Sequence, residues 1–115
     1  MVHVGATACT LTEILDLLRP GDIVTHCFHG KAAGLLDNGQ VLPAAFAARE
    51  RGVLFDTGHG TTQMSYLVAR TAIAAGLTPD TISSDLSRRN WRKPAYDLLT
   101  LTTSPRSQAV IFVSV

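Results

Sequence analysis

The chain has 115 residues, of which 46% are hydrophobic and 17% are charged, and its net charge is +1. This length fits a single domain with a modest core, and the apolar content excludes a disordered chain. The near-zero charge offers no basic field for nucleic acid, and no apolar run approaches the ~20 residues that cross a membrane. We expect no signal peptide, because the first residues lack a charged region followed by an apolar one. The two cysteines make no disulfide framework, so a reducing, cytoplasmic setting is expected.

Four β-rich runs alternate with three amphipathic patterns of helical period. The expected strands are residues 1–4, 23–28, 53–56 and 80–85. The expected helices begin at Thr10 or Thr12, at Pro43, and at Thr61 or Thr62, and they end near residues 19, 51 and 76. The intervening residues 31–40 are expected to form a loop. Because helices separate the strands, right-handed crossovers and a parallel sheet are predicted.

The helices should face the sheet with apolar stripes. In the first helix the stripe is Leu11, Ile14, Leu15, Leu17 and Leu18, and in the third the inward residues are Leu67, Val68, Ala72, Ile73 and Ala75. Beyond residue 85 the pattern weakens. A basic run around Trp91 is expected to be a solvated loop, residues 96–101 could form a short helix, and residues 109–113 are β-like.

All four histidines lie at or just beyond the carboxyl ends of expected strands, where parallel α/β folds bind ligands. They are His3, His26, His29 and His59, and Asp85 ends the fourth strand. Imidazole and carboxylate are ligands of zinc and similar ions, and strands ~4.8 Å apart allow neighbouring histidines to reach one ion. A bound metal acidifies water to hydroxide and polarises a carbonyl, while a nearby aspartate can transfer the proton. These residue types therefore predict metal-assisted hydrolysis.

Three longer runs resemble one known family. Residues 19–30 (RPGDIVTHCFHG), 51–60 (RGVLFDTGHG) and 79–86 (PDTISSDL) are similar to the C-terminal half of the amidohydrolase/deacetylase metallohydrolases, which are dihydroorotase-like members of the amidohydrolase superfamily. The resemblance covers residues 1–99. It implies an α/β fold, a partial (β/α)8 TIM barrel of about four βα units that correspond to strands five to eight. This barrel segment would occupy residues 1–101, followed by a divergent tail at residues 102–115.

The resemblance also implies roles for individual residues. His3, His26 and Asp85 would bind a divalent metal, usually zinc, and Asp85 would also be the catalytic acid and base. His59 and Gly60 would contact the substrate. The implied reaction is hydrolysis of a C–N amide, a cyclic amide or an acyl ester of a small molecule by a metal-bound hydroxide.

Parts of the family pattern are missing. The His-x-His pair of the first strand and the carboxylated lysine of the fourth have no counterpart, and Ser87 stands where the family usually has a histidine. Because three protein ligands remain at most, we expect the isolated chain to bind metal weakly and to turn over little. The alternative is a catalytically inactive half-barrel that associates with itself or with a separately encoded N-terminal half. A small flavodoxin-like binding domain is a third hypothesis, although residues 5–8 make a poor phosphate loop.

Each candidate also has an ordinary structural explanation. His3 could be a terminal surface residue, and His26 a hydrogen-bonded core histidine. His29 could be a loop residue or could orient a ligand. His59 could simply occupy a tight turn, and Asp85 could be a helix N-cap.

Overall fold

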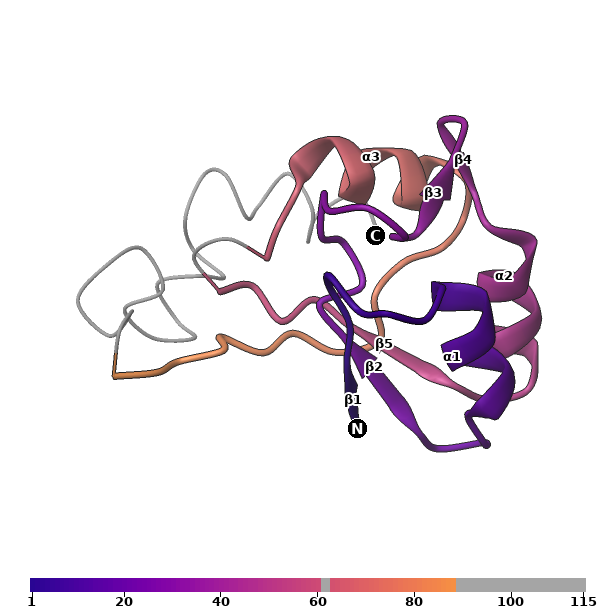
Figure 1. The fold of residues 1–115 in the computed structure, drawn as a ribbon, viewed down its shortest axis with the longest axis horizontal. Helices are drawn as coiled ribbons and strands as arrows, with labels where there is room; N and C mark the ends of the chain where they lie inside the picture. Colours follow the sequence, from indigo (N-terminus) through magenta and orange to yellow (C-terminus); the bar gives the residue numbers. More distant parts are fainter. Residues whose placement is uncertain (61–62, 89–115) are drawn as a thin grey trace.

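A short parallel sheet lies at the centre of the protein, in the part of the computed structural model that is described, residues 1–60 and 63–88 (Figure 1). Its strands are β1 (Val2–His3), β2 (Ile23–Thr25) and β5 (Leu54–Asp56), in the order β1-β2-β5. Both pairings are parallel. The predicted parallel sheet is confirmed.

The expected fourth strand, residues 80–85, is reduced to a single parallel bridge between Asp56 and Thr81. Beyond the bridge, the amides of His59 and Gly60 donate to the carbonyls of Ser83 and Ser84, at 2.9 and 3.4 Å. This segment therefore follows β5 along its edge without forming a regular strand. The sheet is open in the described residues, and no closed barrel forms.

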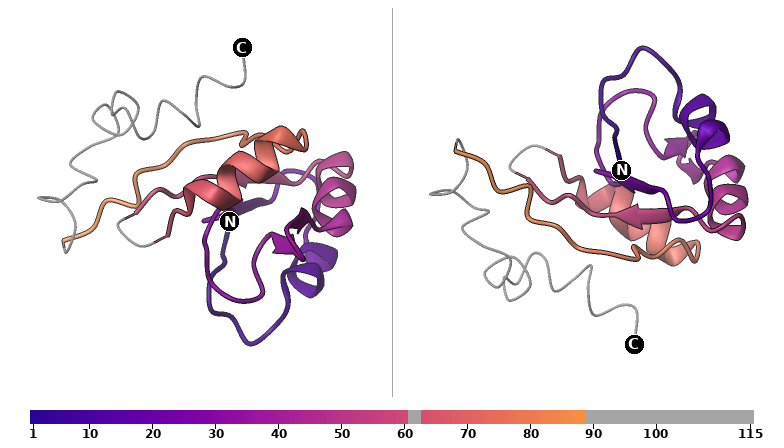
Figure 2. Two further views of the ribbon diagram at one scale, coloured as in Figure 1. Left: turned by 90° about the horizontal axis from the view of Figure 1, so that it is seen from above. Right: turned by 90° about the horizontal axis from the view of Figure 1, so that it is seen from below.

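Three helices connect and cover the strands. They are α1 (Leu11–Leu17), α2 (Pro43–Glu50) and α3 (Tyr66–Ala74). Both views of Figure 2 place α1 beside α2, and the two helices are in contact. The core between the helices and the sheet is built from aliphatic side chains, the two phenylalanines Phe28 and Phe55, and Cys27.

The start of each helix follows from local chemistry, and two of the three starts were predicted. Thr10 caps α1 in a capping box: its hydroxyl accepts from the Glu13 amide, and the Glu13 carboxylate accepts from the Thr10 amide at 2.8 Å. Pro43 begins α2 as predicted. The third helix starts later than expected, at Tyr66, because Ser65 caps it. The predicted caps Thr61 and Thr62 lie outside the described residues.

Three residues assigned to apolar stripes were placed wrongly. Leu17 is 81% exposed, Leu67 is 75% exposed, and Ala75 is also exposed. In α1 the buried positions are Leu11 and Leu15, four residues apart on one face, and Leu17 points away from that face. A short helix buries a narrower stripe than its apolar residues suggest.

The segment expected to be a loop contains a small hairpin. Strands β3 (Leu36–Asp37) and β4 (Gln40–Val41) pair antiparallel across Asn38 and Gly39. Both turn residues have positive φ, +48° and +78°, as the type I′ turn of an Asn-Gly hairpin requires.

The other expectations beyond residue 88 lie outside the described residues. They are the basic run around Trp91, the short helix at 96–101, the β-like run at 109–113 and the divergent tail at 102–115. None of the helices in the described part of the chain is long and apolar enough to cross a membrane.

Candidate functional site

Two histidines from neighbouring strands meet at the carboxyl end of the sheet. His3 ends β1, and His26 directly follows β2, the strand paired with β1. Their ring centroids are 4.3 Å apart, with the ring planes at 70°, so the rings touch edge to face. The sheet thus brings together two of the three predicted metal ligands.

A turn at His26 ends β2 three residues before the predicted end of the strand. The backbone of His26 has a φ of +64°, a left-handed conformation that is rare for residues with a side chain, although histidine adopts it more often than most. The side chain is 2% exposed, and Nδ1 lies 2.6 Å from the Gly58 carbonyl oxygen. Because a carbonyl only accepts, Nδ1 carries a proton in this contact, and Nε2 is the ring nitrogen that a metal could use.

Gly58 makes this contact possible. Its φ is +48°, and a Cβ added to it would lie 2.4 Å from His26 Nδ1 and 2.4 Å from Thr25 Oγ1. Any side chain here would collide with the buried histidine. The glycine therefore allows the loop after β5 to hold the His26 ring.

Asp85, the third predicted ligand, lies near the pair without completing a metal site. Its φ is +49°, and its Oδ2 would lie 2.9 Å from a Cβ added to Gly60. Desolvation and the neighbouring His26 lower the pKa of His3, and the Asp85 carboxylate opposes this shift. Within residues 1–60 and 63–88, however, no three His, Cys, Asp or Glu side chains are arranged to hold a metal ion. The roles of His3, His26 and Asp85 as ligands stay predictions.

His59 and Gly60, the predicted substrate contacts, lie in the loop after β5. His59 Nδ1 is 3.0 Å from the Gly60 carbonyl oxygen, and its Nε2 is 3.5 Å from the Tyr66 hydroxyl. Burial lowers the pKa of His59. A neutral imidazole that contacts both its own loop and α3 is consistent with the tight-turn explanation, and it is equally consistent with a contact to substrate.

His29 is buried beneath the same end of the sheet and is 1% exposed. Its Nδ1 accepts from the Lys31 amide at 3.1 Å, and its own amide donates to the His26 carbonyl at 3.1 Å. Burial is the main cause of its lowered pKa, and the charge of Lys31 adds to it. His29 therefore shapes the turn on which His26 sits.

Sequence reasoning missed a buried carboxylate at this edge. Asp56 is 1% exposed, and it accepts hydrogen bonds from the hydroxyls of Thr25 and Ser83, both at 2.6 Å, and of Thr81 at 2.8 Å. The three hydroxyls come from β2 and from the segment that leads to Asp85. The signal available in the sequence was an aspartate directly after an apolar run.

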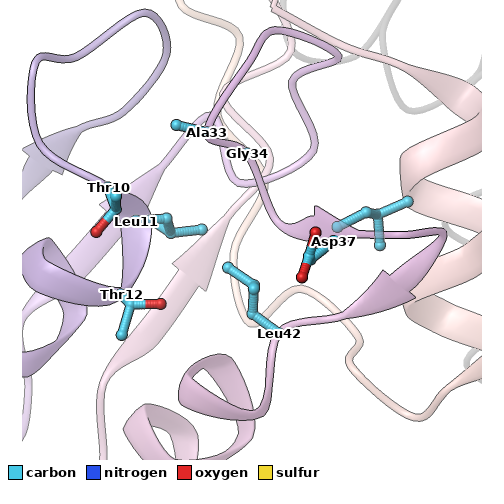
Figure 3. Close-up of a pocket in the computed structure, with 8 residues that line it drawn as sticks. Thr10, Leu11, Thr12, Ala33, Gly34, Asp37 and Leu42 are labelled. Carbon is cyan, nitrogen blue, oxygen red and sulfur yellow. The ribbon is translucent and has the colours of Figure 1, made fainter.

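A separate pocket of about 330 Å³ lies between the start of α1 and the hairpin (Figure 3). It is lined by Thr10, Leu11, Thr12, Ala33, Gly34, Leu36, Asp37 and Leu42. None of these residues belongs to the predicted site. The strand ends remain the stronger candidate, because they gather imidazoles and a buried carboxylate, whereas the pocket offers mainly aliphatic surface.

Comparison with known proteins gives close relatives. No family model matches the chain. It is 44% identical over 103 residues to a deacetylase of Enterococcus faecalis, and 41% identical over 101 residues to a deacetylase of Agrobacterium fabrum. A deacetylase of Brucella anthropi is 40% identical over 101 residues. Each match covers 87% of this chain but only 25–28% of the relative, so the chain spans about a quarter of their length.

Two solved structures share the fold. An adenine deaminase matches with a TM-score of 0.81 and 37% identity, over 96% of this chain and 30% of that protein. A dihydroorotase matches with a TM-score of 0.80 and 36% identity, over 98% of this chain and 30% of that protein.

Proposed function

Because the chain belongs to the amidohydrolase/deacetylase family, we propose that it is a segment of a metal-dependent hydrolase that cleaves a C–N amide, a cyclic amide or an acyl ester bond of a small molecule. The resemblance found in the sequence is confirmed by the deacetylase, deaminase and dihydroorotase matches. The matches support a hydrolase segment, and the choice of bond and metal is our proposal.

The contact between His3 and His26 carries the proposal. Two imidazoles from neighbouring strand ends lie 4.3 Å apart, and the Gly58 carbonyl fixes the proton of His26 on Nδ1. This donor chemistry fits zinc, for which Nε2 of His26 and a nitrogen of His3 would be two ligands. When bound, zinc would supply Lewis-acid chemistry, acidifying water and polarising a carbonyl.

The other predicted residues would act around this pair. Asp85 would hold a proton on its carboxylate close to His3, and His59 with Gly60 would contact the substrate. Histidine nitrogens that remain neutral near pH 7 suit this arrangement, and desolvation lowers the pKa of both His3 and His59.

The ligand set is incomplete in the described residues, which supports the alternative of an association module. Zinc sites use at least three protein ligands, and in the described residues the predicted ligands His3 and His26 are in contact without a third. The outer edge of β1 has no partner strand within residues 1–60 and 63–88. We propose that the missing ligands and strands come from a complementing N-terminal half or a second copy, and that the isolated chain is weakly active or inactive.

The proposed setting is the cytoplasm. Cys9 and Cys27 are free thiols, and Cys27 is buried in the core, where desolvation raises the pKa of its thiol. Such a core thiol serves packing and needs no oxidising compartment.

Zinc titration followed by calorimetry tests the proposal. Wild type should bind zinc weakly, and His26→Ala should lose this binding. His59→Ala is the matched control, since it removes a histidine without touching the pair, and should bind as wild type does. Unchanged zinc stoichiometry in His26→Ala would overturn the assignment. A nanomolar zinc dissociation constant together with hydrolysis of an N-acyl or ester substrate would overturn the expected weakness of the isolated chain.

A further inference from the structure

The two residues that flank His26 are both bonded to Asp56, at the end of β5. The Thr25 hydroxyl donates to the Asp56 carboxylate at 2.6 Å, and the Cys27 amide donates to the Asp56 carbonyl at 3.3 Å. Thr25 and Asp56 are also partners in the pairing of β2 with β5. The backbone on both sides of His26 is therefore anchored to one residue of the neighbouring strand.

The turn at His26 needs such anchors. Its φ of +64° is a left-handed conformation, and a residue with a side chain keeps that conformation only where the surrounding contacts hold it. The imidazole is held as well, because the carbonyl oxygen of Gly58, two residues after Asp56, lies 2.6 Å from Nδ1. The end of β5 thus fixes the backbone and the ring of His26 together, and with them the direction of Nε2.

The carboxylate of Asp56 is suited to this role. It is buried, and its two oxygens accept hydrogen bonds from three hydroxyls, those of Thr25, Thr81 and Ser83. A carboxylate accepts hydrogen bonds and donates none, so it can bind all three hydroxyls at once. The bonds from Thr25 and Ser83, both 2.6 Å, have the length of charge-assisted bonds, which are about twice as strong as neutral ones. The side chain is therefore held in one position.

The hydroxyls differ in what lies next to them along the chain. Thr25 directly precedes His26 and donates to Oδ2 of Asp56. Thr81 forms the bridge beside β5 and donates to the other carboxylate oxygen, Oδ1. Removing either hydroxyl takes one hydrogen bond from Asp56, but only the loss at Thr25 loosens the turn at His26. An effect on stability can thus be separated from an effect on the position of the ring.

We propose that Asp56 is a positioning residue for the candidate site: through the Thr25 hydroxyl it holds the turn at His26, so that the ring keeps its proton on Nδ1 and leaves Nε2 for a ligand. The use of this position in metal binding rests on the proposed function. The position itself depends only on Asp56, Thr25, Gly58 and His26.

The test uses the full chain without metal near pH 8, well above the ordinary histidine pKa of ~6.5, where NMR of the imidazole nitrogens reports which one carries the proton. Wild type should show His26 as the Nδ1–H tautomer alone. Thr25→Val, which replaces only the hydroxyl, should add an Nε2–H population, and Thr25→Ser should return the wild-type signal. Asp56→Ala should give the same change as Thr25→Val, which keeps the test decisive if Asp56→Ala does not fold.

Thr81→Val is the matched control, because it removes one hydroxyl from the same carboxylate at a residue that does not adjoin His26 in the chain. It should lower the free energy of unfolding in urea but leave the His26 tautomer as in wild type. Zinc affinity should fall about tenfold in Thr25→Val, as expected when a group that orients a ligand is lost, and it should stay unchanged in Thr81→Val.

An unchanged His26 tautomer in Thr25→Val, or an equal change in Thr81→Val, would overturn the inference and leave Asp56 a purely structural residue. So would a wild-type ring that carries its proton on Nε2. The proposed function fails separately. If wild type binds no zinc and the tautomer still differs between Thr25→Val and Thr81→Val, the hydrolase proposal falls and the positioning role stands. If zinc binds through His26 and the tautomer responds to neither variant, the reverse holds.

Discussion

The backbone takes the left-handed conformation at both ends of the parallel sheet, but different residue types adopt it at the two ends. At the amino ends of the strands, the left-handed conformation falls on Gly21 and Gly52, whose backbones are bonded to each other at 2.8 Å. At the carboxyl ends it falls also on His26 and Asp85. Glycine takes this conformation without steric cost, whereas a side chain costs about 1–3 kcal/mol. His26 and Asp85 therefore place backbone strain at the predicted site, and Ala33 and Asn38 place some in the segment that leads to and forms the hairpin.

The burial of the aspartates also differs between the two ends. Asp80, at the amino end, pairs with Arg49, and both side chains are partly exposed, at 30% and 25%. Asp56, at the carboxyl end, is 1% exposed and holds three hydroxyls. The amino end thus carries a partly exposed ion pair, whereas the carboxyl end holds a buried carboxylate in a fixed position, as expected of the face where α/β folds bind ligands.

The largest effect is expected for Gly58→Ala. The new methyl group would meet His26 and Thr25 at 2.4 Å in a backbone with positive φ, so the free energy of unfolding should fall by roughly 4 kcal/mol. Gly21→Ala is the control from the other end, because its φ is +85° but nothing lies within 4 Å, and it should lose about 1 kcal/mol. Urea unfolding measures both. Equal losses would remove the distinction between the ends.

Asp56→Ala should have the next largest effect on the free energy of unfolding. It leaves the buried hydroxyl of Thr25 and two neighbours without their acceptor, so we expect a loss of about 3 kcal/mol. Asp80→Ala removes a part-exposed ion pair and a bond to the Phe55 amide, and should cost about 1–2 kcal/mol. A greater loss in Asp80→Ala, measured in the same unfolding experiment, would contradict the comparison.

Thr10→Ala tests a residue that lies on the carboxyl side of the sheet but serves only as a helix cap. Loss of the capping box should cost about 1 kcal/mol. Thr12 lies two residues after Thr10 and takes no part in the capping box, so Thr12→Ala should change thermal stability little. A similar loss in both variants would argue against the cap.

The smallest effect is the pH dependence that His29 introduces. Burial holds its pKa below the ordinary value of 6.5, so the unfolded chain binds the proton more readily. His29 therefore does not reduce the free energy of unfolding at pH values well above 6.5, and it reduces this free energy as the pH falls below 6.5. In His29→Gln, which keeps an acceptor for the Lys31 amide, the free energy of unfolding should decline less between pH 6.5 and about 5. An identical decline in wild type and His29→Gln would show that His29 contributes nothing to it.

Several local features could be predicted because their signals are contained in a few adjacent residues. The capping box of Thr10 and Glu13 needs only residues three apart, and Pro43 fixes the start of α2 through its own ring. The Asn38-Gly39 hairpin carried an equally local signal, but residues 31–40 were predicted as a loop. The start of α3 was missed because Ser65 competes with earlier threonines for the cap, and sequence alone does not rank them.

Residue type and spacing were enough to predict the alternation of strands and helices, the parallel sheet and the position of the histidines at the strand ends, and the family followed from the resemblance of three sequence runs to known proteins. Tertiary structure decided where β2 stops, because the turn at His26 is held by the Gly58 carbonyl, 32 residues away. It also decided the role of Asp56, whose partner hydroxyls lie 25–31 residues distant. Such contacts depend on how the loops after neighbouring strands fold against one another, and no local pattern in the chain specifies that.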